Sequence, residues 1–513
     1  MFVWGCAVAF AGSATWKTNP VTGDWNTPSN WMPRTVPNGI SDIATFNSST
    51  VTDISFSSGA TVGGIIFNPG ASPFSISVYG PSSPNLMIYG SGVTNNSGII
   101  QQIVVSKDAT SMSNGTYFNG SALAGVDVVY TNNGSLMNFL DSSSADHASI
   151  ISDGNANGFG VVEFFGTSTA GEATIINNGA VLTSPENEGV LIFLENSTAG
   201  EALITSNGGM GAGSFGAQTQ FDGFSNAANA VLVANGGVDG GLGGRIFFLT
   251  HGTGGTSRVE LFGNGALDMS NQFLKQVTIG SLEGDGLAFL GGGNLTVGSN
   301  SLTTTFAGVI QDGGGFGGSG ASLTKTGTGT LTLAGTSTYT GGTTVSASVL
   351  LVANSAGSAT GSGAVTVDAG SLGGGGIIGG AVTIGSGSGT GAFLAPATGM
   401  VQATLTIQNI LTLKSDATYT CTIKARRNRA KTDVVIANGV TIDSGAKINL
   451  HGTVRGTLRQ GLVLTLVSNT AANPMSGTFS NLPDGAIVTV NGNNLQADYE
   501  GGDGNDLTLT VVP

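Results

Sequence analysis

The hexapeptide Ser168-Thr169-Ala170-Gly171-Glu172-Ala173 recurs 29 residues later as Ser197-Thr198-Ala199-Gly200-Glu201-Ala202. Each copy leads into a short apolar segment and then into an Asn-Gly step, at 178–179 and at 207–208. Further Asn-Gly steps at 235–236 and 264–265 extend the series, so successive glycines are 29, 28 and 29 residues apart. A fixed period of this size indicates a stack of short repeated units.

Each period holds two to three strand-like segments joined by Gly and Asn turns, which is the content of one coil of a parallel β-helix. Like residues of successive coils would lie ~4.8 Å apart, so Ile, Val and Phe would form a continuous core and stacked Asn would form a hydrogen-bonded ladder. The pattern therefore predicts an all-β chain, a parallel (right-handed) β-helix or solenoid with an N-terminal cap and a β-rich C-terminal unit. Alignment on Ala173 and Ala202 assigns the same coil position to Ala148, Ala230 and Arg258.

Composition agrees with this architecture and excludes several functions. Of 513 residues, 86 are Gly, 9% are charged and 40% are hydrophobic, a mixture that favours strands and turns over helices. The net charge is −14, and an acidic chain with few cations is a poor ligand for nucleic acid or for an anionic membrane. No segment reaches the ~20 apolar residues of a transmembrane helix.

The N-terminus predicts export. Residues 1–14 are apolar and end in small residues, as in a signal peptide that lacks its basic start, with a buried first strand as the alternative. Cys6 lies in this segment, and a lipoprotein cysteine there is disfavoured because Trp4 stands where a small residue is needed. Removing the segment leaves Cys421 as a single thiol, so we expect a secreted or cell-surface protein without disulfides.

Three of the four tryptophans, Trp16, Trp25 and Trp31, lie close together near the start. We expect them to cap the open end of the solenoid, since terminal repeats are atypical, and stacking on sugar rings is the alternative. The expected division of the chain has five segments: a possible truncated signal peptide at 1–14, the N-terminal cap and first coils at 15–100, the 28–29-residue coils at 101–277, a second repeat region at 278–385 and a closing unit at 386–513.

The second repeat region has its own ordered motifs. They are Thr278–Gly286 (TIGSLEGDG), Gly293–Gly298 (GNLTVG), Thr305–Gly314 (TFAGVIQDGG), Leu323–Gly335 (LTKTGTGTLTLAG) and Tyr339–Val345 (YTGGTTV). This stretch resembles the autotransporter-associated β-strand repeat of bacterial surface and secreted proteins. Ser337 and Ser348-Val349 depart locally from the usual Asn and Gly-Thr of that family.

The resemblance implies a structural or adhesive protein at the bacterial surface that presents a long polar face for multivalent contacts. Glycans or other cell-surface components are the implied partners, and no cofactor is implied. Because only 128 residues follow 385 and few are aromatic, the resemblance is to a passenger without an outer-membrane barrel of its own. We expect no enzyme activity, with a polysaccharide-cleaving β-helix enzyme as the alternative.

The enzyme alternative depends on Glu172 and Glu201. Stacked in successive coils, these carboxylates would lie ~5 Å apart, close to the spacing in a retaining glycosidase. The neighbouring copies carry His147, Asn229 and Ser257, so two solvated glutamates at a turn are the favoured interpretation. The histidines at 147, 251 and 451 are isolated in sequence, which gives no local support to a triad or a histidine metal site.

Two further segments are candidate binding sites. Gly501–Leu509 nearly matches the calcium nonapeptide, which makes Asp503 and Asp506 candidate ligands, but a single copy completes no shared site and a Gly-rich turn is favoured. Residues 424–431 concentrate five of the sixteen basic residues, including Arg426, Arg427 and Arg429, at an expected hairpin tip. Such a tip could bind an anionic glycan or partner, and a solvated loop is the alternative.

Overall fold

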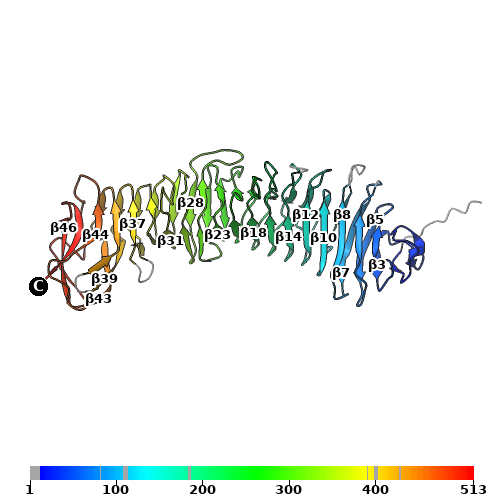
Figure 1. Cartoon of the computed structure of the whole chain (residues 1–513), viewed down its shortest axis with the longest axis horizontal. Coiled ribbons are helices and arrows are strands. Elements are labelled where there is room, and N and C mark those ends of the chain that lie inside the picture. Colours follow the sequence, from blue (N-terminus) through cyan, green and yellow to red (C-terminus); the bar gives the residue numbers. More distant parts are fainter. Residues whose placement is uncertain are drawn as a thin grey trace, which may run out of the picture. The chain divides into compact units, whose positions relative to one another are not determined.

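The computed structural model describes residues 12–80, 82–107, 114–182, 186–389, 391–397, 402–426 and 429–513. The chain divides into a first unit that ends at Leu267 and a second unit that begins at Asp268. Within each unit, strands of successive coils lie side by side in chain order and pair in parallel (Figure 1). This arrangement confirms the predicted all-β parallel β-helix.

The first unit has two broad sheets, one strand of each per coil. The first sheet begins with the antiparallel pair β1–β2, next to the single-turn 3-10 helix η1 (Pro28–Asn30), and then pairs in parallel from β3 onward. Its strands are β1 (Ala14–Trp16), β2 (Trp31–Met32), β3 (Gly39–Phe46), β5 (Ala60–Phe67), β7 (Asn85–Asn95), β9 (Gly115–Phe118), β11 (Leu136–Phe139), β13 (Gly160–Phe164), β15 (Gly189–Phe193), β17 (Gln218–Phe221), β19 (Arg245–Phe248) and β21 (Ala266–Asp268).

The second sheet forms the opposite wall of the same coils and is parallel from β4 to β20. The strands of this second sheet are β4 (Asp53–Ser55), β6 (Ser75–Val78), β8 (Gln101–Ser106), β10 (Val128–Asn133), β12 (Ser149–Asp153), β14 (Thr174–Asn177), β16 (Leu203–Ser206), β18 (Val231–Ala234) and β20 (Arg258–Leu261). Single parallel bridges, such as the one between Thr169 and Thr198, form a narrow third side of the coils.

A column of phenylalanines runs through the core of the first unit. Each ring comes from the last residue of a strand in the first sheet and stacks on the ring of the next coil, with centroids 4.5–5.2 Å apart. All six are fully buried, so the column fixes the register of every coil it passes through. The rings belong to Phe118, Phe139, Phe164, Phe193, Phe221 and Phe248.

The duplicated hexapeptide forms the turn that enters the second sheet. Gly171 and Gly200 have φ of +62° and +61°, and a Cβ on Gly200 would lie 2.6 Å from the carbonyl oxygen of Gly171. The hydroxyls of Thr169 and Thr198 accept hydrogen bonds from these two glycine amides, at 3.0 and 3.2 Å. The alanines point inward and Glu172 is exposed, so the motif sets the bend and presents its carboxylate to solvent.

The strand register corrects one part of the sequence alignment. Val231 of β18 pairs with Arg258 of β20, so Ala230 is equivalent to Ser257 and not to Arg258. The exposed position that carries Glu201 is therefore followed by Asn229 and then by Thr256, whose hydroxyl contacts the Asn229 side chain. The alignment predicted from sequence was therefore wrong by one residue at Arg258, because the coil that ends at Ser257 is one residue shorter than the coil that ends at Ala230.

Three of the Asn-Gly steps form the predicted asparagine ladder. The Asn178 side-chain amide donates to the Asp153 carboxylate at 2.6 Å, Asn207 donates to Asn178 at 2.8 Å, and Asn235 donates to Asn207 at 2.8 Å. The fourth, Asn264, departs from the series: its amide donates to the Gly241 carbonyl and its oxygen accepts from Gly237 N–H.

The tryptophans close the N-terminal end from within. Trp16, Trp25 and Trp31 are at most 1% exposed, and Trp31 packs edge-on against both of the others at 5.0 Å. Each indole N–H donates to a backbone carbonyl, at 2.7–3.2 Å. The rings are thus part of the core, as the cap interpretation predicts, and none offers a face to a sugar.

In the second unit the coils are three-sided. One parallel sheet contains β23 (Ser281–Gly284), β26 (Thr304–Phe306), β29 (Thr330–Leu333), β31 (Ser348–Val352), β33 (Gly370–Gly374), β36 (Ala392–Ala395), β39 (Ala417–Arg426) and β43 (Lys447–Arg455), with β40 (Arg429–Thr432) beside β39. A second parallel sheet of the same coils contains β22 (Gln276–Ile279), β25 (Asn294–Val297), β28 (Ser322–Lys325), β30 (Gly342–Val345), β32 (Val365–Val367), β35 (Val382–Ile384), β38 (Leu411–Leu413) and β42 (Val440–Ile442).

The third side of these coils begins with β24 (Leu287–Phe289) and β27 (Val309–Gln311), which pair in parallel, and resumes farther along the chain. It ends in an antiparallel group, in which β47 pairs with both β44 and β46 and β46 pairs with β45. Its later strands are β34 (Ile377–Ile378), β37 (Thr404–Ile407), β41 (Val434–Ala437), β44 (Val463–Asn469), β45 (Ile487–Val490), β46 (Asn493–Gly501) and β47 (Asp506–Val512). Among the described residues, no helix has the length and apolar character needed to cross a membrane.

Candidate functional site: a cationic three-stranded face

The basic segment predicted as a hairpin tip is a hairpin made by β39 and β40. The two strands pair antiparallel, which sets Lys424 opposite Lys431 and Arg426 opposite Arg429. β39 pairs with β36 of the preceding coil only as far as Tyr419, and from Ile423 onward the same strand pairs with β40 instead. Arg427, the third arginine of the prediction, lies outside the described residues.

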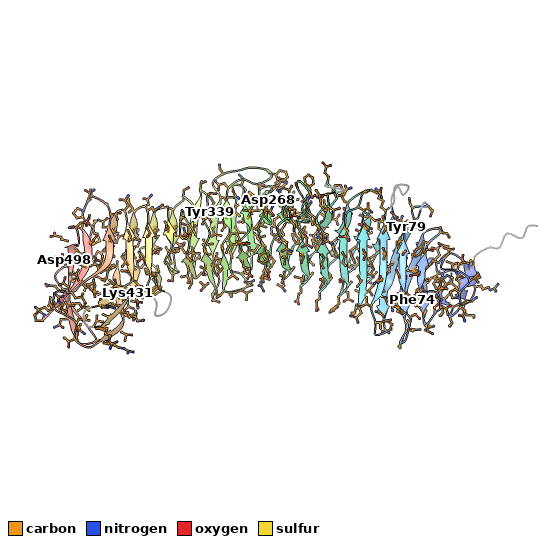
Figure 2. The ribbon with its side chains drawn as sticks, viewed as in Figure 1. Phe74, Tyr79, Asp268, Tyr339, Lys431 and Asp498 are labelled. Carbon is orange, nitrogen blue, oxygen red and sulfur yellow. The ribbon has the colours of Figure 1, made fainter. Side chains whose placement is uncertain are left out.

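A third strand completes the face. β43 pairs in parallel with the other edge of β39, and its last residue, Arg455, lies opposite Arg426. Arg429, Arg426 and Arg455 therefore form one row across three strands, and Lys431, Lys424 and Thr453 form the next row. Lys431 marks this face in Figure 2. Arg455 was not predicted from the sequence, because β41 and β42 separate it from the basic run.

Alternation along each strand places these side chains on one side. On β39, Lys424 and Arg426 are exposed and Ala425 between them is buried, and Arg429 and Lys431 of β40 are exposed in the same alternation. The two rows line a groove of about 530 Å³, whose lining also includes Ala425 and Ala430. We call Lys424, Arg426, Arg429, Lys431 and Arg455 the cationic face.

The cationic face is electrostatically unfavourable by itself. Like charges directly opposite each other on neighbouring strands destabilise a sheet. No ion pair joins any of the five cations to another described residue, although Lys414 in the same unit pairs with Asp443 at 3.3 Å. The arrangement concentrates positive potential on a protein whose net charge is −14, and a ligand with several anionic groups would relieve the repulsion.

The predicted carboxylate pair lies in the first unit, at the turn before the second sheet. Glu172 and Glu201 occupy equivalent positions of successive coils, as the repeat predicts, and both are exposed. His147, one coil earlier, contacts Glu172 through Nε2 at 3.2 Å and Asp146 through Nδ1 at 2.8 Å. The hydrogen bond to Asp146 raises the pKa of His147, so the histidine's role here is that of an exposed ion-pair partner.

The other two histidines are in different surroundings. His251 stacks on the exposed ring of Phe224 with centroids 4.9 Å apart, and His451 is exposed on β43 opposite Thr422. Cys421 is fully buried, and burial raises the pKa of its thiol to about 12. A thiol with that pKa stays protonated at neutral pH and is a poor nucleophile. Cys6 lies outside the described residues.

Of the candidate calcium ligands, Asp503 lies in the turn between β46 and β47, and Asp506 is the first residue of β47. One carboxylate oxygen of Asp506 accepts a hydrogen bond from Asn469 N–H at 2.8 Å, and burial raises the pKa of Asp506. Asp503 is exposed on the same turn. Within the described part of the chain, no group of three or more His, Cys, Asp or Glu side chains is arranged to hold a metal ion.

Comparison with known proteins identifies a repeat in the second unit. Residues 323–352 match the family model of the passenger-associated-transport-repeat. This match confirms the predicted passenger-type repeat for the segment from β28 to β31, which includes the motifs at 323–335 and 339–345.

One solved structure covers most of the chain. The Haemophilus influenzae Hap adhesin is 13% identical with a TM-score of 0.27, over 92% of this chain and 59% of that chain. The present chain thus spans less than two thirds of the length of that protein. No curated protein matches the sequence.

Proposed function

We propose that the protein is an adhesive β-solenoid of the bacterial surface or its secretions, and that the cationic face binds an anionic polysaccharide. The observation that carries this proposal is the row of Arg429, Arg426 and Arg455, held in register and without an anionic partner among the residues that the structure describes. Guanidinium groups bind sulfate, phosphate and carboxylate groups through paired hydrogen bonds, which suits a polymer carrying one such group per repeat.

The passenger-associated-transport-repeat at 323–352 supports a surface or secreted location. The hydrogen-bonded column of asparagines and the in-register Thr169 and Thr198 support adhesion through many weak contacts, since neighbouring coils present the same side chain at about the same spacing. The sequence led to the hypothesis that Arg426 and Arg429 bind an anionic glycan. We extend this hypothesis to Arg455, Lys424 and Lys431, which lie on the same face.

The test measures binding of the full chain to dextran sulfate, with uncharged dextran as the polymer control. We expect dextran sulfate to bind and dextran not to bind, with affinity falling as salt rises because the contacts release counterions. In the variant Arg426→Ser/Arg455→Ser, the slope of log affinity against log salt should fall by about one unit for each removed cation.

The matched control is Arg34→Ser/Lys275→Ser, which removes two exposed cations that lie outside the cationic face. Its net charge equals that of the Arg426→Ser/Arg455→Ser variant. It should bind dextran sulfate as the parent protein does. Equal weakening by both double variants would show that net charge, and not the cationic face, determines binding, and the proposal would then be wrong.

A further inference from the structure

A second groove lies in the first unit, along the asparagine ladder. It has a volume of about 730 Å³ and extends over five successive coils, from Asn133 to Val238. This volume is within the range of small-ligand sites, ~300–1,000 Å³. The groove contains none of the residues discussed above as catalytic, metal-binding or anion-binding candidates.

One wall of this groove is made of amides. The side chains of Asn178, Asn207 and Asn235 each use one amide hydrogen in the ladder, and the oxygens of Asn178 and Asn207 each accept once. A carboxamide offers two hydrogens and two lone pairs, so every step of the ladder keeps a donor and an acceptor for a ligand. All three side chains are half-buried and line the groove.

The other wall is apolar. Val181, Met210 and Val238 pair with one another in parallel across successive coils and are 41%, 58% and 55% exposed. A soluble protein gains nothing for its own stability from an in-register apolar column in water, and such columns mark interaction sites. Between the walls, glycines bring the coils close together: a Cβ on Gly179 would lie 2.3 Å from the carbonyl oxygen of Gly208.

We propose that this groove, which we call the amide groove, binds an uncharged linear polysaccharide lying along the stacking direction of the coils. A pyranose presents hydroxyls at its edge and C–H groups on its face, which match the amide wall and the apolar wall. The amide and apolar columns both repeat at the coil spacing of ~4.8 Å, so the ligand is a chain whose extended repeat is close to that value. An extended β-1,4-linked hexose chain meets this requirement.

Charge and backbone pairing argue against other occupants. Asp153 is the one ionisable residue among those lining the groove, and its carboxylate already accepts from Asn178. An anionic polymer would find no cation there. A peptide adding a strand would need free backbone groups, but Met210 N–H donates to the Ala180 carbonyl and Val238 N–H donates to the Gly209 carbonyl.

The experiment titrates the full chain with β-1,4-linked glucose oligomers of two and six sugars, at low and at high salt. We expect the hexamer to bind more tightly than the dimer, because more coils are engaged, and binding to be insensitive to salt. The variants Met210→Glu and Asn235→Ala should each weaken hexamer binding by about fivefold to tenfold, the effect of losing one apolar contact or one hydrogen bond.

Two matched controls lie on the same unit but outside the groove. Leu203→Ser removes an exposed apolar side chain from β16, and Asn196→Ala removes an exposed amide from a turn. Both should bind the hexamer as the parent does, and so should Arg426→Ser/Arg455→Ser, which separates this proposal from the proposed function. Absence of hexamer binding, unchanged binding in both groove variants, or tighter binding of an uncharged hexapeptide than of the hexamer would each overturn it.

Discussion

The asparagine ladder of the first unit and the cationic face of the second are built in the same way and have opposite energetics. In both, the register of neighbouring strands places like side chains next to each other. A carboxamide is both donor and acceptor, so Asn207 hydrogen-bonds to Asn178 and to Asn235. Arg426 can only repel Arg429 and Arg455. Stacking in a solenoid thus amplifies the character of a residue: it stabilises amides and destabilises cations.

Lys325 is a third case, a cation that is buried. Its side chain is 1% exposed, its ammonium donates to the Ser348 hydroxyl at 2.7 Å, and burial lowers its pKa to about 8. The unfolded chain, with a pKa near 10.5, binds more protons between pH 8 and 10.5, so stability should rise with pH through that window. Below pH 8 the buried Lys325 is charged in the folded protein, so the full free-energy cost of its desolvation is present. Lys325→Met should therefore stabilise the protein at pH 7 by about 3 kcal/mol and remove the rise, measured by urea denaturation at several pH values.

Breaking the ladder is the next largest effect. Asn207→Leu keeps the branched shape of the side chain but leaves the Asn178 oxygen and the Asn235 amide without partners. We expect a loss of about 2–3 kcal/mol, since each unpaired half-buried polar group costs about 1 kcal/mol or more. The control Asn196→Ala, at an exposed turn position, should change stability by less than about 0.5 kcal/mol. Equal losses in the two variants would mean that the ladder contributes nothing specific.

The turn of the hexapeptide provides a test of register itself. Gly200→Ala should cost about 2 kcal/mol, because its φ of +61° disfavours a side chain and the new Cβ would meet the Gly171 carbonyl. Gly213 has a φ of +79° with open space around its Cβ position, so Gly213→Ala should cost only about 1 kcal/mol. Thermal unfolding of the two variants measures the difference, and a larger loss for Gly213→Ala would contradict the close stacking of the turns.

Reversing one charge on the cationic face should have the smallest effect. Arg426→Glu replaces two repulsive cross-strand pairs with attractive ones, and we expect a gain of about 0.5–1 kcal/mol at low salt that fades at high salt. Arg426→Gln, which removes the charge without reversing it, should give about half of that gain. A destabilised Arg426→Glu protein would show that the cations do not strain the sheet.

The fold could be read from sequence largely because one residue type recurs at one spacing. The ladder of Asn178, Asn207 and Asn235 follows directly from the Asn-Gly period, and the inward alanines and outward Glu172 follow from the hexapeptide. The register at Arg258 did not follow from the period, because a coil can lose one residue in a turn without changing its core. Arg455 was missed for a different reason: parallel pairing joins residues one coil apart, and no local pattern links it to Arg426.

The apolar wall of the amide groove was also beyond sequence reasoning. Val181, Met210 and Val238 follow Asn-Gly steps at similar distances, and that recurrence was the available signal, but the pattern alone does not say whether such residues point inward or outward. The binding roles of Arg426 and Arg429, and the possible calcium ligands Asp503 and Asp506, stay predictions.

The close approach of Gly179 to Gly208 has a consequence for how such a chain can change in length. Because both corners carry an Asn-Gly step, excising the segment between them would join one corner to its equivalent in the next coil and keep the asparagine ladder in register. An excision of any other length that reached into a strand would turn inward side chains toward water, whereas a turn can lose a single residue, as the coil that ends at Ser257 has done. The core of this region therefore changes length in whole coils, and the amide groove grows or shrinks by one asparagine at a time.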